Sequence, residues 1–437
     1  MVADNTYSMV PTLRSLLAAG AILLTAGPLA AATRLTSHVN GALVPVEWKA
    51  SSFPIAYKAD QRLIAALPGG AAVLDRAFGA WTSAPNSNVS FRSAGIEPGL
   101  RAGKDNQSVI TLTDELFNDQ KAIAITTTWD EGGIITEADI QIDASLVNST
   151  YNIPQAIAHE IGHMLGLDHS GVLSAAMYPY VTRGTDAPAL DSDDRIAIAN
   201  IYPKGNLTMA GGTLQGRVVG DSGPIFAAQV VAVNDEGEPV ATVLTDASGE
   251  FSLAGMPDGT YRIYVEPLDG PVETRNLSPA WRQGVVSAFA TSFIEGNPIH
   301  VESGRVYGNL VVRTRGGAVE LNPRWIGVAA ANSAEFALTS TAATVKPGST
   351  ISLAVAGDGI FSAMTTFEVL SPGFRRVSDY RYAGNYVYAN YEVGSTAPVG
   401  SAVIVVSSGT QTATLTGALR VQGGSGPGPG RVRGVRG

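Results

Sequence analysis

The chain has 437 residues, a formal net charge of −9, 45% hydrophobic residues, 15% charged residues and no cysteine. This length exceeds what one ordinary hydrophobic core supports and predicts two to four domains. The absence of cysteine excludes disulfide bonds, a thiolate nucleophile and cysteine ligands for a metal. An acidic balance without a broad basic patch argues against nucleic acid as a partner.

Residues 1–32 have the features of a signal peptide. Arg14 precedes an apolar run, residues 16–32, which ends in small residues suited to cleavage. The alternative is a membrane anchor, but the run is short for a membrane span and Gly27-Pro28 interrupts it. We therefore expect a protein that is exported, released from the membrane after cleavage, and secreted into the extracellular space.

Residues 33–205 have the pattern of one mixed α/β domain. Helices are expected over residues 71–84, where apolar side chains recur at helical spacing, and over 154–166, which Pro154 opens and Gly166 ends. A last helix begins at an acidic pair and stops at Pro203. Strands are expected over 46–60, 88–94, 108–115 and, as two strands joined by a Gly-Gly turn, within 121–145.

Three of the five histidines of the chain lie within HEIGHMLGLDH, residues 159–169. On a helix, His159 and His163 project from one face because they are four residues apart. Gly166 permits a sharp change of direction, so that His169 can return as a third ligand of the same ion. Three neutral nitrogens suit zinc and leave one coordination position open, as a catalytic site requires.

Glu160 lies beside this cluster and is the expected general base. Zinc lowers the pKa of a bound water from about 15.7 towards 7, and a neighbouring carboxylate can take its proton. An HExxH string also occurs by chance on helix surfaces, but Gly166, His169 and the downstream Met177 extend the match here. A domain that binds zinc without catalysis is the other alternative, and the presence of Glu160 argues against it.

HEIGHMLGLDHS, residues 159–170, followed by SAAMYP, residues 174–179, resembles the metzincin metalloproteases, whose pattern is HExxHxxGxxH and a Met-turn. Within that group the chain is most similar to the matrixins, and LDSDDRIAIANIYP, residues 190–203, resembles their final segment. The resemblance spans about residues 46–203. It implies an α+β fold with a twisted mixed sheet above the zinc-binding helix, and a protein or peptide substrate lying extended in the cleft.

By this resemblance, three imidazoles bind one catalytic Zn²⁺, and one general base accepts the proton of the zinc-bound water. The ligands are His159, His163 and His169, and the base is Glu160. The resemblance also implies that the strand within 121–127 is a sheet edge that pairs with the substrate backbone.

The resemblance assigns supporting roles to residues after the third histidine. Met177 forms an apolar floor under the ion, a role that ordinary core packing would also explain. Tyr178 and Pro179 continue into the wall of the pocket for the side chain after the scissile bond. Asp193 or Asp194 ties the last helix to the Met-turn, although both could equally be simple helix N-caps.

The chain departs from the family in two ways. Animal matrixins are held inactive by a propeptide cysteine, which this chain lacks. Their second, structural zinc uses histidines upstream of the helix, and none lies between His38 and His159, so we expect one zinc. Calcium is possible in this family, but the sequence does not place its ligands. His38 and His300 stand alone and are expected to be solvated or core residues.

The second half of the chain has the short alternating runs of all-β sandwich domains. Residues 212–268 resemble the carboxypeptidase regulatory-like β-sandwich, carried by TDASGEFSLAGMPDGTY and Tyr261. We expect this sandwich with its extension over 210–316, an Ig-like β domain over 320–422, and a disordered Gly/Pro-rich tail over 423–437. Neither region carries a second active site, so both are expected to be binding or spacer modules.

The sequence therefore predicts a secreted zinc endopeptidase followed by β-sandwich domains. The alternative is an exported surface or adhesion protein in which the sandwiches do the work and the zinc domain is vestigial.

Overall fold

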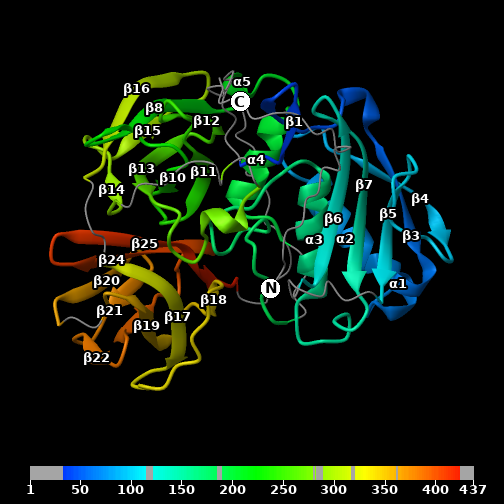
Figure 1. Cartoon of the computed structure of the whole chain (residues 1–437). Helices are drawn as coiled ribbons and strands as arrows, with labels where there is room; N and C mark the ends of the chain where they lie inside the picture. Colours follow the sequence, from blue (N-terminus) through cyan, green and yellow to red (C-terminus); the bar gives the residue numbers. More distant parts are fainter. Residues whose placement is uncertain are drawn as a thin grey trace, which may run out of the picture.

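The computed structural model describes residues 33–114, 122–184, 189–278, 281, 289–315, 320–360 and 363–423. The expected signal peptide and nearly all of the expected tail lie outside these residues. Figure 1 shows three units: an α/β unit (residues 33–206) on the right, a middle sandwich (207–315) at the upper left and a C-terminal sandwich (320–423) at the lower left. Within the described part of the chain, no helix is long and apolar enough to cross a membrane.

The α/β unit is built on a five-stranded mixed sheet of order β4-β3-β5-β7-β6. The first four strands in this order run parallel, and β6 is an antiparallel edge strand joined to β7 by the expected Gly132-Gly133 turn. The strands are β1 (Thr36–Val39), β2 (Ala42–Pro45), β3 (Ile55–Asp60), β4 (Phe91–Glu97), β5 (Ser108–Thr113), β6 (Ala124–Glu131) and β7 (Ile134–Asp143). The helices are η1 (Ala50–Ser52), α1 (Gln61–Ala66), α2 (Ala71–Thr82), α3 (Ile153–Met164) and α4 (Ser192–Ile201).

Helix α2 packs against α3 through the apolar face that its sequence predicted. Its buried residues are Val73, Leu74, Ala77, Phe78 and Trp81. The indole Nε1 of Trp81 donates to the carbonyl oxygen of Ala158 at 2.8 Å, so the polar atom of a fully buried ring is satisfied. This bond fixes the position of α3 one residue before His159.

The prediction of a strand over residues 46–60 was wrong for the first half of that range. Only Ile55–Asp60 is a strand, and the short helix η1 precedes it. Pro54 interrupts the run because proline has no N–H for a sheet ladder. Trp48 instead packs into the core, where its Nε1 donates to the carbonyl oxygen of Met164 at 2.7 Å.

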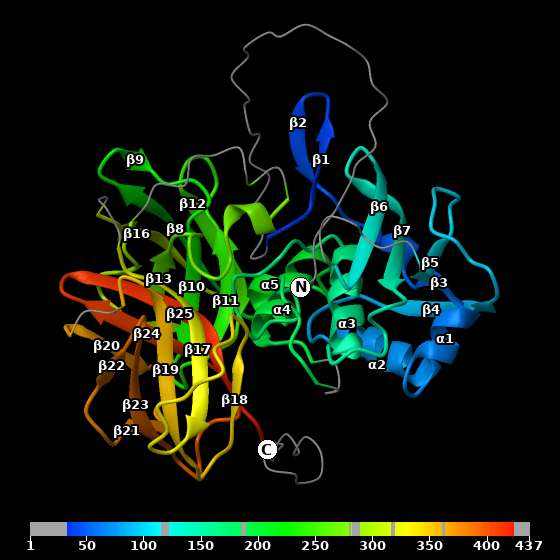
Figure 2. The same cartoon turned by 60° about the horizontal axis from the view of Figure 1, so that its bottom comes forward.

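The hairpin β1–β2, which was not predicted from the sequence, projects from the α/β unit at the top of Figure 2. The segment before this hairpin runs along the residues that follow α3. Leu35 N donates to Gly166 O at 3.0 Å, and Asp168 N donates to Thr33 O at 2.9 Å. The first described residues therefore support the turn of the histidine motif.

Two buried carboxylates of β7 accept hydrogen bonds from the start of β5 and from the loop before it. Asp139 accepts hydrogen bonds from Gly103 N at 2.8 Å and Val109 N at 2.9 Å, while Glu137 accepts from Asp105 N and Asn106 N. Burial raises the pKa of Asp139 to about 7. The backbone of this loop is therefore held by the carboxylates of Glu137 and Asp139.

The middle sandwich consists of two sheets, one ordered β11-β10-β13-β14 with β15 on β13, the other ordered β12-β8-β16 with β9 on β8. Strand β16 pairs in parallel with β8, so the extension expected after residue 270 closes the second sheet. The elements are α5 (Leu207–Ala210), β8 (Gly212–Gly220), β9 (Gly223–Pro224), β10 (Gln229–Asn234), β11 (Pro239–Leu244), β12 (Glu250–Met256), β13 (Gly259–Glu266), η2 (Thr274–Asn276), β14 (Ser292–Phe293), β15 (Ile299–Val301) and β16 (Val306–Arg313).

The C-terminal sandwich also has two sheets, ordered β17-β19-β23-β21 with β22 on β23, and β18-β25-β24-β20. Alternate residues of β23 face its core, and Tyr391 is among them. The strands are β17 (Asn322–Ala330), β18 (Ala343–Val345), β19 (Thr350–Asp358), β20 (Thr365–Val369), β21 (Phe374–Arg376), β22 (Arg381–Ala383), β23 (Tyr386–Val393), β24 (Gly400–Ser408) and β25 (Gln411–Val421).

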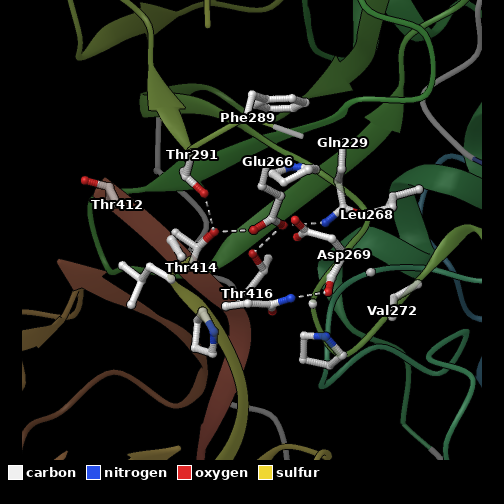
Figure 3. Close-up of a pocket in the computed structure, with 18 of the residues that line it drawn as sticks. Gln229, Glu266, Leu268, Asp269, Val272, Phe289, Thr291, Thr412, Thr414 and Thr416 are labelled. Carbon is white, nitrogen blue, oxygen red and sulfur yellow. Dashed lines mark hydrogen bonds between the residues drawn. The ribbon is translucent and has the colours of Figure 1, made fainter. Parts of the chain in front are cut away.

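The two sandwiches meet at the buried carboxyl group of Glu266, at the end of β13 (Figure 3). It accepts hydrogen bonds from Gln229 Nε2 at 2.6 Å, Thr416 Oγ1 at 2.8 Å and Thr414 Oγ1. The α/β unit joins the same junction, because Leu173 N donates to Thr416 O at 2.8 Å. All three units are therefore connected through strand β25.

Candidate metal centre

Helix α3 places the first two histidines, and the turn after it places the third. The Asn152 side chain caps the helix by accepting from Gln155 N at 3.1 Å. The helix is followed by Gly166 at φ +88°, where a Cβ atom would lie 2.5 Å from the carbonyl oxygen of Val46. Only glycine combines this left-handed conformation with so close a backbone. The chain then reverses and brings His169 back to the helix.

The three histidines converge on one point. One ligand nitrogen of each lies within 4.8 Å of the corresponding nitrogen of the other two. The Nε2 atoms of His159 and His169 are 3.2 Å apart, and all three side chains are buried. In the described part of the chain this is the one such group of metal-ligating side chains.

Each imidazole is oriented by a backbone carbonyl at its Nδ1 atom. His159 Nδ1 lies 2.7 Å from Ala176 O, His163 Nδ1 lies 2.8 Å from Leu167 O, and His169 Nδ1 contacts Asn276 O. A carbonyl only accepts, so each Nδ1 carries the proton and each Nε2 keeps its lone pair for a ligand.

This donor set fits a zinc ion. Burial first, and then the two neighbouring imidazoles, hold the pKa of His159 well below its usual 6.5, so that its ring is neutral as a zinc ligand must be. Three neutral nitrogens with carbonyl partners behind them are the arrangement of a three-histidine zinc site.

Glu160 lies next to the cluster and is held by the edge strand β6. The hydroxyl group of Thr126 contacts Glu160 Oε2 at 2.7 Å and the carbonyl oxygen of the same residue at 2.9 Å. Both residues are buried. The carboxylate therefore has a defined position beside the three imidazoles.

Met177 packs directly under helix α3. A Cβ atom on Gly162 would lie 2.1 Å from the sulfur of Met177, so only glycine allows the helix and the methionine to approach this closely. Ser170 N donates to Met177 O at 2.8 Å, which links this turn to the residue after the third histidine.

Two neighbouring aspartates of α4 have different partners. Asp194 accepts from Ala176 N at 2.7 Å and Met177 N at 3.0 Å, and it also closes a capping box with Asp191. Asp193 accepts instead from Ser170 Oγ at 2.6 Å and from Thr242. The sequence left open which aspartate ties the last helix to the turn around Met177. In the structure Asp194 contacts that turn, and Asp193 connects the residue after His169 to the middle sandwich.

A segment of the middle sandwich, not predicted from the sequence, contacts the third histidine. Besides the Asn276 carbonyl at His169, Ser278 N donates to Asp168 Oδ2 at 2.9 Å, while Asp168 Oδ1 accepts from His169 N at 2.8 Å. No local signal in the sequence could reveal the contacts of Asn276 and Ser278, because each is separated from its partner by more than one hundred residues.

A cavity of about 220 Å³ opens beside His159. Tyr178 and Tyr180 line it, whereas Pro179 between them is buried and does not. The other two histidines, His38 and His300, are exposed and lie outside the metal-ligating group.

Comparison with known families agrees with this geometry. Residues 69–203 match the family model Matrixin, and residues 213–284 match the model Carboxypeptidase regulatory-like domain. The chain therefore contains a matrixin domain followed by a carboxypeptidase regulatory-like domain, as the sequence resemblance predicted.

The chain also matches individual proteins, over 51 to 140 residues in the three examples that follow. The chain is 47% identical to Karilysin of Tannerella forsythia over 58 residues, covering 13% of this chain and 12% of that protein. It is 29% identical to Metalloendoproteinase 2-MMP of Arabidopsis thaliana over 140 residues, covering 30% and 36%. The match to the Hatching enzyme of Paracentrotus lividus is 49% over 51 residues, covering 12% and 9%. The chain thus spans little more than a third, or less, of the length of these relatives.

Solved structures offer weaker likenesses. The Bacillus anthracis TIE protein is 11% identical with a TM-score of 0.17, covering 44% of this chain and 33% of that one. The major pilin subunit BcpA of Bacillus cereus is 13% identical with a TM-score of 0.16, covering 45% and 63%. At these TM-scores the likenesses carry no weight for fold or function.

Proposed function

We propose that the chain is a secreted zinc-dependent endopeptidase that hydrolyses peptide bonds. The observation that carries the proposal is the convergence of three imidazoles whose Nδ1 atoms all face backbone carbonyls. The matrixin match over residues 69–203 supports a metalloprotease.

In this proposal, His159, His163 and His169 hold the zinc ion through Nε2. Zinc bound there would lower the pKa of a water molecule and polarise the carbonyl of the scissile peptide bond. Glu160 accepts the proton of the attacking water and returns it to the leaving amine. The Thr126 hydroxyl keeps that carboxylate in place, since a charged acceptor makes a stronger hydrogen bond than a neutral one.

The edge strand β6 supplies a backbone for an extended substrate. Its outer side has no sheet neighbour in the described part of the chain, so a peptide could add to it as a further strand. Such pairing would position the scissile bond without demanding particular side chains.

The test is cleavage of an unfolded protein such as casein, with metal content measured in parallel. Wild type should bind one zinc per chain and cut casein, and a chelator should abolish cutting. Glu160→Ala should keep the zinc and lose cleavage by about 10²-fold or more. Equal cleavage by the variant would indicate a contaminating protease, and stoichiometric zinc without any cleavage would favour an adhesion role for the sandwiches.

Export is part of the proposal and rests on residues 1–32. Its check is N-terminal sequencing of the protein recovered outside the cell. A mature chain that begins near residue 33 supports the assignment, and an uncleaved chain held in the membrane contradicts it.

A further inference from the structure

The cavity beside His159 is walled by two units of the protein. One wall comes from the α/β unit, including Ala156 of helix α3 and the turn around Tyr178. The opposite wall comes from the C-terminal sandwich, through Thr341, Thr344 and Arg420. A module expected from the sequence to be a binding or spacer domain therefore borders the space next to the metal centre.

The wall from the C-terminal sandwich is held in place by specific contacts. Arg420 donates through Nη2 to Ser174 O and to Asp191 Oδ1, the latter at 3.1 Å. The hydroxyl group of Tyr178 donates to Ser340 O. These three contacts, together with the Leu173–Thr416 backbone bond at 2.8 Å, join this sandwich to the α/β unit at Leu173, Ser174, Tyr178 and Asp191.

Close backbone packing adds to these bonds. Gly417 of β25 has φ +71°, and a Cβ atom there would lie 2.7 Å from both Ser174 Oγ and Val172 Cγ1. A side chain at this position would push the two units apart. The strand carrying Arg420 thus approaches the cavity wall as closely as its backbone allows.

The lining of the cavity includes two arginines. Arg183 lines it from the α/β unit, with its guanidinium carbon 5.8 Å from the centre of the Tyr151 ring, and Arg420 lines it from the C-terminal sandwich. The rest of the lining consists of six hydroxyl or amide residues, two tyrosines, His159 and six apolar residues. No carboxylate is among the described residues that line it. Arg420 forms an ion pair with Asp191 at 3.1 Å, and 33% of the surface of its side chain is exposed.

The guanidinium groups of Arg183 and Arg420 favour the binding of some substrate side chains over others. A carboxylate would receive charge-assisted, potentially bidentate hydrogen bonds from arginine. A bulky apolar side chain would strip water from the same groups and offer no hydrogen bond in return. Thr344 lies opposite Arg420 in the register of β18 and β25, so it sits on the cavity side of the same wall.

We propose that the C-terminal sandwich completes the substrate pocket and that this pocket, through Arg183 and Arg420, selects an acidic side chain of the substrate. The proposal rests on the proposed peptidase function and names the substrate class of that site. The ligand chemistry is a carboxylate, which could belong to an internal glutamate or to the C-terminus of a peptide. We assign it to the internal side chain.

The first experiment compares quenched fluorescent peptides, amidated at the C-terminus, that differ only in having Glu, Gln or Leu after the scissile bond. For the full mature chain we expect kcat/KM at least tenfold higher for Glu than for Gln. Equal rates for Glu and Gln, or a preference for Leu, would overturn the acidic pocket while leaving the peptidase function standing.

Two matched variants add a negative charge to the C-terminal sandwich, one at the cavity and one away from it, and a third variant removes an arginine. Thr344→Glu should abolish the preference for Glu over Gln, because the new carboxylate forms ion pairs with the arginines and competes with the substrate. Thr366→Glu, an exposed threonine on β20 of the same sandwich, should leave the preference unchanged. Arg183→Gln should reduce the preference severalfold without touching the contacts between units. An unchanged preference in both Thr344→Glu and Arg183→Gln contradicts the proposal.

A binding experiment tests the acidic pocket independently of the peptidase activity. Glu160→Ala is titrated with the amidated Glu and Gln peptides and with a Leu peptide carrying a free C-terminus, using fluorescence anisotropy. Tighter binding of the amidated Glu peptide by tenfold or more supports the pocket even if wild type cleaves nothing. Binding of the free C-terminus alone would show that the carboxylate recognised is a terminal one, and equal binding of all three peptides would refute the pocket.

Discussion

The imidazole of His169 hydrogen bonds through Nδ1 to the carbonyl oxygen of Asn276, which lies 107 positions later in the chain. Asn276 ends the short helix η2, in the middle sandwich. One of the three candidate zinc ligands is therefore oriented by a unit that sequence reasoning treated as an accessory. The metal centre depends on contacts between units as well as on the histidine motif.

We predict that Asp168→Ala weakens zinc binding. This carboxylate accepts from His169 N and from Ser278 N, so its loss frees the segment that orients the His169 ring. Loss of such a supporting contact lowers metal affinity by about 10–100-fold. Competition with a chromophoric chelator measures the change. Asp246→Ala, in an exposed turn of the middle sandwich, is the control, and equal affinities in the two variants would refute the idea.

Thr126→Val should lower kcat without loss of zinc. The substitution removes the hydroxyl group that contacts the Glu160 carboxylate at 2.7 Å while keeping the shape of the side chain. We expect kcat to fall about tenfold, which corresponds to about 1.4 kcal/mol. Thr126→Ser keeps a hydroxyl and should restore most of the rate. A serine variant as slow as the valine variant would mean that packing, rather than the hydrogen bond, holds Glu160.

Gly166→Ala should destabilise the α/β unit more than Gly132→Ala. Both glycines have positive φ, +88° and +65°, but only at Gly166 would the new Cβ meet a backbone atom, Val46 O, at 2.5 Å. The conformational cost is of order 1 kcal/mol in both variants, and the clash adds about 1–3 kcal/mol at Gly166. Denaturant unfolding of the two variants gives the difference. Equal losses would show that the backbone near Val46 yields easily.

The stability of the junction in Figure 3 should fall as pH rises through neutrality. Burial raises the pKa of Glu266 from 4.5 to about 7. The folded chain therefore keeps a proton that the unfolded chain has released, so the stabilisation is complete below pH 4.5 and is lost as pH rises through about 7. The shift corresponds to about 3 kcal/mol at most.

Glu266→Gln tests this pH dependence, because glutamine stays neutral at every pH. Denaturant unfolding of the metal-free protein at pH 5 and pH 8 should show a smaller difference for the variant than for wild type. Glu335→Gln, at an exposed site of the C-terminal sandwich, serves as control and should behave as wild type. A Glu266→Gln variant with the full wild-type slope would place the titrating group elsewhere, with Asp194 as the next candidate because burial raises its pKa to about 7.

The sequence by itself determined the histidine cluster and the elements that carry it. His159 and His163 share a face because the helix repeats every 3.6 residues, and Gly166 permits the reversal that returns His169. These relations involve residues close together in the chain, so local geometry suffices to predict them. The same holds for helix α2, whose apolar spacing predicted its buried face.

Only the tertiary structure decided what surrounds the cluster. The Asn276 carbonyl at His169, the Thr126 hydroxyl at Glu160 and the Arg420 wall of the cavity all come from segments distant in the chain. That Asp194 rather than Asp193 contacts the turn around Met177 also depended on how α4 packs against its neighbours. Such contacts follow from how whole units pack together, and no periodicity of one segment encodes the position of another.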